Sequence, residues 1–239
     1  MNAIYKKEIR NYFKTPLGYI FIAALFALTA IFFVFGVISN YQNATINMIF
    51  NNVLGSSNII CLFLVPILTM QLFSEERNKK TDQLLITSPI SVWDIVLGKY
   101  FAALAVFLLA VLATFIFPFI LYIIGKPNFI TMFGSYLGFV LMWACFISIG
   151  VFISSLTESQ VISAIMTLVV LFVLYILDGL TGSITQVWLR TAVSWLSVLK
   201  RNADFSVGLI NIPDILYYIS FVFTFLFLTQ RNIEKRRYS

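Results

Sequence analysis

The fold is decided by Ser74-Glu75-Glu76-Arg77-Asn78-Lys79-Lys80-Thr81-Asp82-Gln83, which leads into Leu84-Leu85-Ile86-Thr87-Ser88-Pro89. Long runs without charge lie on both sides of this stretch. A single Asp or Lys at the middle of a bilayer costs ~2.5–3.5 kcal/mol on insertion scales, so this stretch cannot lie there. It therefore joins two membrane spans outside the bilayer, and we expect residues 75–90 to form a helix at the membrane surface.

The composition of the chain is that of an integral membrane protein. Of its 239 residues, 60% are hydrophobic and 11% are charged, whereas soluble domains contain ~25% charged residues. The length allows one helical bundle, residues 1–239, and no separate soluble domain. Lys and Arg number 16 against 10 Asp and Glu. This excess suits contact with anionic lipid headgroups, so we do not expect a nucleic acid partner.

Several kinds of chemistry are excluded by residues that the sequence lacks. It contains no histidine, which excludes a Ser-His-Asp triad and histidine-ligated zinc. Cys61 and Cys145 both lie within apolar runs, so we expect buried thiols and neither a disulfide nor a metal site. Gly98-Lys99 and Gly125-Lys126 lack the first glycine of a phosphate-binding loop. We therefore expect no catalytic residue, metal or cofactor in this chain.

Six apolar runs are long enough to cross a bilayer. We expect membrane-spanning helices at about residues 17–39, 57–73, 100–124, 129–154, 161–177 and 214–230. Pro66 and Pro118 are expected to bend the second and third helices. The polar, uncharged residues 40–56 predict a loop, and residues 178–212 predict an extracytoplasmic loop with short helices. Because no span carries a charge at its middle, an ion-coupled transporter or pump is disfavoured.

The N-terminal residues 1–15 predict an amphipathic helix that lies in the membrane interface. Its basic residues, including Lys7, fall on one half of the helical wheel and its apolar residues on the other. Glu8 is anomalous because it falls on the apolar half. It is either a carboxylate that reaches water at an edge or a fixed partner for a basic residue of a neighbouring helix or subunit.

Three local patterns predict contacts at helix ends and faces. Ser91-Val92-Trp93-Asp94 is typical of a capping box at the start of a helix. Trp93 and Lys99 are expected to anchor this helix at the membrane interface. Gly134 and Gly138 have the spacing of closely packed membrane helices, which would serve packing, including a dimer face, or arise by chance.

The distribution of basic residues predicts the orientation of the bundle. With six spans, both termini share a side with residues 75–99. That side carries Lys6, Lys7, Arg10, Lys14, Arg77, Lys79, Lys80, Lys99, Arg231, Lys235, Arg236 and Arg237, and the other carries Lys126, Arg190, Lys200 and Arg201. Cytoplasmic loops are enriched in Lys and Arg, so we expect both termini and residues 75–90 in the cytoplasm.

Motifs along nearly the whole chain resemble those of one transporter family. They are Tyr5-Lys6-Lys7-Glu8-Ile9, Pro16-Leu17-Gly18-Tyr19-Ile20, Leu64-Val65-Pro66-Ile67-Leu68-Thr69-Met70, Ser74-Glu75-Glu76-Arg77, Lys80-Thr81-Asp82-Gln83-Leu84-Leu85, Ser88-Pro89, Leu97-Gly98-Lys99, Gly134-Ser135-Tyr136-Leu137-Gly138 and Ser154-Ser155-Leu156-Thr157-Glu158. A further stretch is Phe205-Ser206-Val207-Gly208-Leu209-Ile210. In order and spacing they resemble permease subunits of ABC-2-type exporters, closest to the gliding-motility-type branch.

This resemblance implies an all-α, type V exporter-like fold with six transmembrane helices. It implies an N-terminal elbow helix containing Lys7 and Glu8, a cytoplasmic coupling helix at 75–90 between spans two and three, and short extracytoplasmic helices before span six. The residues expected to couple to an ATPase are Glu75, Glu76, Arg77, Lys80, Thr81, Asp82, Leu84, Leu85 and Pro89. Glu158 is a candidate for a second contact with the ATPase.

The resemblance also implies the partners and the location. Such permeases work as dimers of two copies or of two related chains, with two ATP-binding subunits that hold ATP and Mg²⁺. An accessory membrane-anchored extracytoplasmic protein often accompanies them. The implied location is the bacterial cytoplasmic membrane, where the chain crosses the bilayer several times.

The expected function is therefore that of a non-catalytic permease subunit in an ATP-driven exporter. One alternative is a membrane anchor or scaffold of a surface, gliding or secretion machine that transports nothing itself. Another is a passive channel. A separate alternative for residues 75–83 is a solvated connector without a coupling role. The cargo stays open at this stage.

Overall fold

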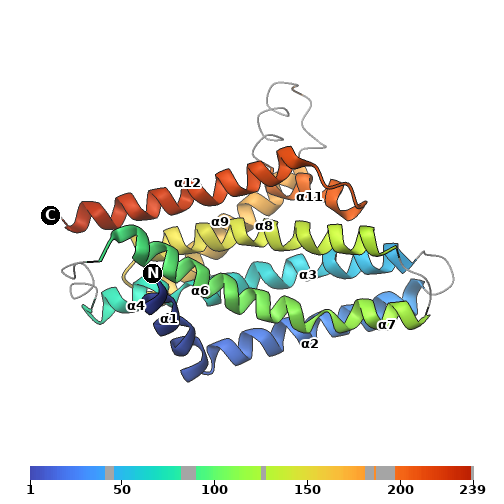
Figure 1. Ribbon diagram of the computed structural model, residues 1–239, viewed down its shortest axis with the longest axis horizontal. Helices are drawn as coiled ribbons and strands as arrows, with labels where there is room; N and C mark the ends of the chain where they lie inside the picture. The colour runs from blue at the N-terminus through green and yellow to red at the C-terminus, as the bar shows by residue number, and fades with distance from the viewer. Residues whose placement is uncertain (41–45, 82–89, 125–127, 181–185, 187–196, 238–239) are drawn as a thin grey trace.

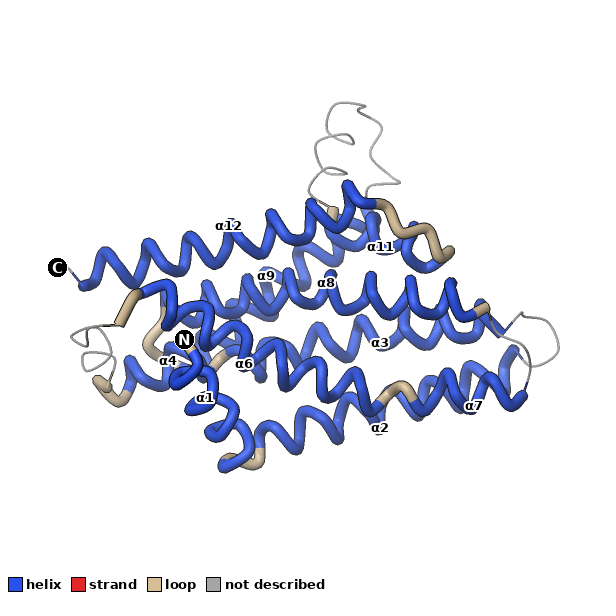
Figure 2. The backbone as a smooth tube through the Cα atoms, viewed as in Figure 1, coloured by secondary structure: helices blue, strands red, loops and turns tan. Residues whose placement is uncertain are grey.

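The computed structural model describes residues 1–40, 46–81, 90–124, 128–180, 186 and 197–237, which form helices and no strand. The helices are α1 (Asn2–Lys14), α2 (Leu17–Asn40), α3 (Ile46–Thr69), α4 (Gln71–Asn78), α6 (Val92–Ala113), α7 (Ile116–Ile124), α8 (Phe129–Leu156), α9 (Gln160–Leu180), α11 (Val198–Ser206) and α12 (Ile212–Arg237). The long helices run side by side, and α1 crosses them at one end (Figures 1 and 2).

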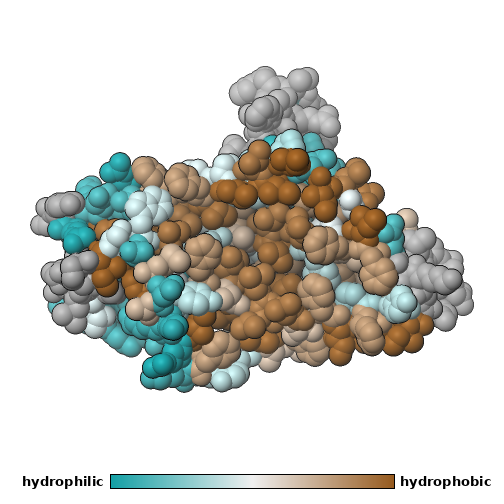
Figure 3. Space-filling view, viewed as in Figure 1, coloured by the Kyte–Doolittle hydropathy of each residue, from teal (hydrophilic) through white to brown (hydrophobic). Residues whose placement is uncertain are grey.

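Six stretches of helix in the described residues are long and apolar enough to cross a membrane, as the sequence predicted. They are Leu17–Ile38, Asn47–Asn78, Val92–Ile123, Phe129–Leu156, Gln160–Leu177 and Ile212–Arg237. Apolar residues cover the middle of the bundle in Figure 3, while polar residues gather at the end that carries α1 and the C-terminus. We call this end the charged end.

The second spanning helix begins earlier than the sequence predicted. Residues 40–56 were expected to form a loop, but α3 is helical from Ile46. Its polar side chains have partners inside the bundle: Asn51 donates to the carbonyl of Ser206, and Asn58 accepts from Trp143 Nε1. Because these contacts satisfy the amides, uncharged polar residues are compatible with a buried helix here.

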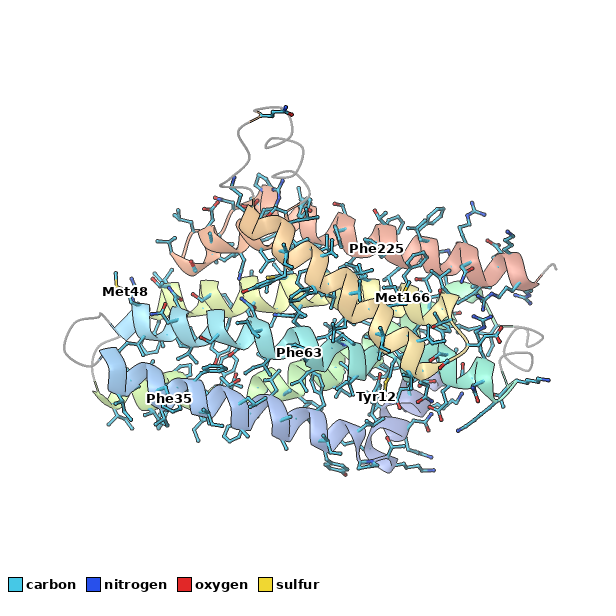
Figure 4. All side chains as sticks on the ribbon, turned by 180° about the vertical axis from the view of Figure 1, so that it is seen from behind. Tyr12, Phe35, Met48, Phe63, Met166 and Phe225 are labelled. Carbon is cyan, nitrogen blue, oxygen red and sulfur yellow. The ribbon has the colours of Figure 1, made fainter. Side chains whose placement is uncertain are left out.

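Helix α8 forms the centre of the bundle. It packs against α3, α4, α6, α9, α11 and α12, and its middle is almost fully buried, from Met142 to Val151. Cys145 lies in this segment and Cys61 faces it from α3; both are buried free thiols, as predicted. On the rear face, α9 crosses obliquely over α3 and α8 (Figure 4).

The helix that contains Pro66 breaks four residues after the proline, at Met70, between α3 and α4. Ser154 of α8 lies at this break: its hydroxyl donates to the carbonyl of Met70 and accepts from the backbone amides of Phe73 and Ser74, at 3.1 to 3.3 Å. One hydroxyl therefore satisfies backbone groups that the interruption exposes.

A second break separates α6 from α7, four residues before Pro118. Pro118 has no N–H with which to bond the Thr114 carbonyl. The hydroxyl of Tyr136 on α8 donates to that carbonyl instead, at 3.0 Å, and the Tyr136 ring stacks on Phe115 with 4.3 Å between centroids. The backbone amide of Phe117 also donates to this carbonyl, at 3.1 Å. The third span is thus interrupted where α8 supplies a further donor.

We expect Tyr136→Phe to lower the free energy of unfolding by about 1 kcal/mol, because the buried Thr114 carbonyl loses one donor while the ring packing is kept. The thermal midpoint of the purified chain in detergent measures this loss. Tyr122→Phe is the control, since Tyr122 is exposed on α7. Equal midpoints for the two variants would contradict this role of Tyr136.

Candidate functional site

Four charged side chains from three helices meet at the charged end. They are Lys7 and Glu8 of α1, Glu76 of α4 and Lys99 of α6, and we call them the four-charge cluster. Lys99 Nζ lies 3.1 Å from Glu8 Oε1 and 2.8 Å from Glu76 Oε2. Lys7 Nζ lies 2.8 Å from Glu76 Oε1. Each lysine therefore contacts both carboxylates, since Lys7 also lies 3.9 Å from Glu8 Oε1.

Lys99 is the most buried member of the cluster. Its side chain is only 1% exposed, it donates to the carbonyl of Leu72, and its ammonium lies 4.9 Å from the centre of the Phe73 ring. The prediction that Lys99 anchors the helix at the membrane interface is therefore wrong. Glu8, on the apolar half of α1, is the fixed partner of this basic residue of another helix.

Apolar packing encloses the cluster. Gly98 allows α1 to approach α6 closely, because a Cβ at this position would lie 3.1 Å from the Ile4 side chain. The buried Tyr12 hydroxyl donates to the carbonyl of Leu68 at 2.7 Å. These contacts hold α1 against α3 and α6 on both sides of the charges.

Lys7 is held in its charged form by the carboxylates around it. Burial by itself lowers the pKa of Lys7, but the hydrogen bond to Glu76 and the charges of Glu76, Glu8 and Glu75 outweigh burial and raise the pKa above its ordinary value. Lys7 is therefore protonated at neutral pH, and its stabilising contribution is lost only as pH rises through this raised pKa.

A second link joins the end of α4 to the turn between α8 and α9. Arg77 Nη2 donates to Glu158 Oε1 at 2.7 Å, and the Glu158 side chain is 75% exposed. Just before this turn, the side chain of Asn232 from α12 donates to the backbone carbonyl of Ser155, in the last turn of α8, at 3.0 Å. The turn that contains Glu158 therefore touches α4, and the end of α8 next to it touches α12.

The residues predicted to couple to an ATPase fall into three groups in the structure. Glu75, Glu76 and Arg77 lie on the last turn of α4, which continues the second span and ends at Asn78. Lys80 has a left-handed backbone with φ of 55°, and Thr81 follows it in an exposed position. Asp82, Leu84, Leu85 and Pro89 lie outside the described residues. The first residues of the expected 75–90 helix are thus the end of the spanning helix.

The start of α6 differs in part from the predicted capping box. Ser91 is the N-cap residue, but its side chain makes no capping hydrogen bond. Asp94 lies 3.4 Å from the N-terminal ammonium of Met1. Trp93, the other expected anchor, stacks on Phe223 of α12 with 5.9 Å between ring centroids. The first turn of α6 therefore contacts the N-terminus and the middle of α12.

Gly134 and Gly138 lie beneath α11 of the same chain. A Cβ at Gly134 would lie 2.9 Å from the carbonyl oxygen of Phe205, and one at Gly138 would meet Asn202. Their faces are therefore covered within the chain, which does not suit a dimer face. Within the described ranges, no group of three or more His, Cys, Asp or Glu side chains is placed to hold a metal ion.

Lys99 and Tyr12 belong to this site although the sequence did not predict it. The available signal was that Lys99 and Glu8 are each an isolated charge on an otherwise apolar surface. Two such charges of opposite sign at the same end of a bundle suggest a buried pair.

We expect Lys99→Met to lower the free energy of unfolding by about 3 kcal/mol, because it leaves two buried carboxylates with one ammonium. Denaturation of the purified chain followed by circular dichroism measures the change. Adding Glu8→Gln to Lys99→Met should recover at least half of the loss by restoring neutrality. Lys6→Met, at an exposed position of α1, is the control, and a loss as small as that of the control would refute the pairing.

The model of a family described as ABC-2 family transporter protein matches residues 2–197, which include the four-charge cluster and Glu158. No curated protein matches the chain.

Proposed function

The chain belongs to the ABC-2 family of transporter proteins, and on this premise we propose that it is the permease subunit of an ATP-driven exporter. Membership makes it a multi-pass membrane component of an ABC transporter, a family whose members generally lack catalysis and normally work with ABC ATP-binding subunits. In our proposal two permease chains, as copies or relatives, form the pathway, and residues 75–90 couple it to two ATP-binding subunits that hold ATP and Mg²⁺.

The observation that carries this proposal is the four-charge cluster, which lies one turn before three exposed residues. These residues are Lys79, Lys80 and Thr81, and their exposure makes them accessible to a partner. Glu76 is bonded to α1 through Lys7 and to α6 through Lys99. A force on Lys79, Lys80 or Thr81 therefore acts on three helices at once.

Glu158 supports a second contact with the same partner. Its carboxylate binds Arg77 near the end of α4 and is largely exposed at the charged end. The charged end thus has two exposed points, Thr81 after α4 and Glu158 between α8 and α9. A partner that binds both points would act on α4 and on the connection between α8 and α9 together.

We further propose that the charged end faces the cytoplasm of a bacterial cell and that the chain is related to the gliding-motility-type branch, with an accessory extracytoplasmic protein as a possible partner. The excess of Lys and Arg at this end supports the orientation. A non-transporting anchor of a surface machine is the alternative, and it would use the same contact with the ATPase.

The contact can be tested by disulfide cross-linking in the assembled transporter. Thr81→Cys should form a bond with a cysteine placed on the ATP-binding subunit, since Thr81 is exposed at the charged end. Met48→Cys is the matched control: Met48 is 59% exposed and lies at the opposite end of the bundle (Figure 4). The native Cys61 and Cys145 are buried and do not compete. A bond at position 48 and none at position 81 would overturn the proposal.

Coupling itself is tested by Asp82→Lys, which reverses a charge in the proposed contact. We expect ATP hydrolysis by the reconstituted complex to continue while cargo flux into vesicles falls at least tenfold. Normal insertion, shown by recovery from the membrane fraction, is the control. Undiminished flux would contradict the coupling role, and the absence of flux from the unaltered complex would favour the anchor.

A further inference from the structure

Two apolar grooves lie on opposite sides of one ridge of α6. The first groove lies between α1 and α6 and has a volume of about 380 Å³. The second lies between α6, α8 and α12 and has a volume of about 350 Å³. On the face drawn in Figure 1, α6 lies between α1 and α12. Phe101 and Leu104 line both grooves, so these two side chains form the ridge that separates them.

The ridge and the grooves lie at the surface that faces the hydrocarbon. The described residues that line them are apolar or aromatic, apart from Asn2 at the start of α1. Phe101 is 42% exposed. From Phe101 to Leu108, the part of α6 along the first groove, a helix advances about 10 Å. This length fits within one leaflet of a hydrocarbon core ~30 Å thick.

The size of the grooves does not suit a helix of a protein partner. A helix is 10–12 Å wide with its side chains, so a segment 10 Å long occupies about 1,000 Å³. Each groove holds less than half of this volume. An extended hydrocarbon chain is much thinner than a helix. Two neighbouring grooves with a ridge between them therefore suit two hydrocarbon chains that are joined at one end.

An acidic side chain lies at the charged end of the first groove. Asp94 precedes Phe101 by seven residues, which is two helical turns, so both lie on the same face of α6. Asp94 Oδ1 lies 3.4 Å from the nitrogen of Met1, and Met1 lines the groove. The Asp94 side chain is 43% exposed. A ligand in the groove can therefore reach this carboxylate.

A basic side chain lies on the other side of the same groove. Lys6 directly follows Tyr5 and comes one turn after Asn2, and both of these residues line the groove. Lys6 is exposed. The charged end of the groove therefore offers an acid from α6 and a base from α1. These two charges match a headgroup that carries one charge of each sign.

We propose that the two grooves bind one phospholipid with two acyl chains and a primary-amine headgroup. The phosphate accepts from the Lys6 ammonium and the Asn2 amide, and the headgroup ammonium donates to Asp94. The acyl chains lie on either side of Phe101. A headgroup without an amine would bring only negative charge to Asp94. The lipid is a resident part of the bundle that holds α1 and α12 against α6, and it is not a cargo.

The test measures lipid binding to the purified full-length chain by native mass spectrometry in detergent. The probes are dioleoyl phosphatidylethanolamine, dioleoyl phosphatidylglycerol and oleoyl lysophosphatidylethanolamine. We expect the first to bind at least fivefold more tightly than the second, because only the first carries an amine for Asp94. The third should bind at least fivefold more weakly than the first, because its single chain leaves one groove empty.

Ala105→Phe places a ring in the first groove, which Ala105 lines at a half-buried position. It should weaken binding of dioleoyl phosphatidylethanolamine at least tenfold. Ala27→Phe is the matched control, because Ala27 is exposed on α2 and does not line either groove. This control should leave binding unchanged. The thermal midpoint without added lipid shows that both variants are folded.

Asp94→Asn tests the headgroup contact and keeps the size of the side chain. It should remove the difference in binding between the two dioleoyl lipids. Asp204→Asn, at an exposed position of α11, should preserve this difference. The proposal would be overturned by equal binding of the three probes, by unchanged binding to Ala105→Phe, or by a preference for the amine that persists in Asp94→Asn. Because no ATP-binding subunit is present, the result is independent of the cross-linking test of the proposed function.

Discussion

The structure depends on the close contact of three charged groups that are shielded from water, the carboxylates of Glu8 and Glu76 and the ammonium of Lys99. Removing each charge from water costs several kcal/mol, and the cost is offset only when close partners and further hydrogen bonds are in place. Glu8, Glu76 and Lys99 come from three different helices. Any displacement of α1, α4 or α6 that separates them leaves a buried charge unpaired. The cluster therefore restricts these helices to a few relative positions.

The same requirement applies to the backbone at the two helix breaks. Met70 and Thr114 each lie where a long helix is interrupted, and in both cases α8 supplies a further hydrogen-bond donor to the carbonyl, from Ser154 and Tyr136. In hydrocarbon an unpaired backbone group costs several kcal/mol. Helix α8 therefore stabilises the bundle by hydrogen bonding as well as by packing, and the breaks are places where the spanning helices change direction without losing partners.

Much of this arrangement could be predicted from the sequence, and the misses have physical reasons. The six spans follow from hydropathy, which is a local property. The start of α3 was missed because Asn51 and Asn58 look like loop residues. Their amides are satisfied by the backbone carbonyl of Ser206 and the side chains of Ser135 and Trp143, which are distant in sequence. Lys99 can be buried only because Glu8 and Glu76 pair with it. Both residues are distant from Lys99 in sequence, so no local sequence pattern predicts its burial.

Helices α3 and α4 connect two polar regions of the protein, the contacts of Asn51 and Asn58 with α8 and α11 and the four-charge cluster. From Asn58 to Glu76 in the cluster the chain advances 18 residues, a distance of about 27 Å for a helix that rises 1.5 Å per residue. Near the Met70 break, a Cβ at Gly150 would lie 2.8 Å from the Thr69 Cβ, so α3 and α8 are in close contact there. A close contact beside a break gives a fixed point about which α4 can tilt relative to α3. Under the proposed function, a push after α4 would then act through one helix on the contacts of α3 with α11, with α8 as the support.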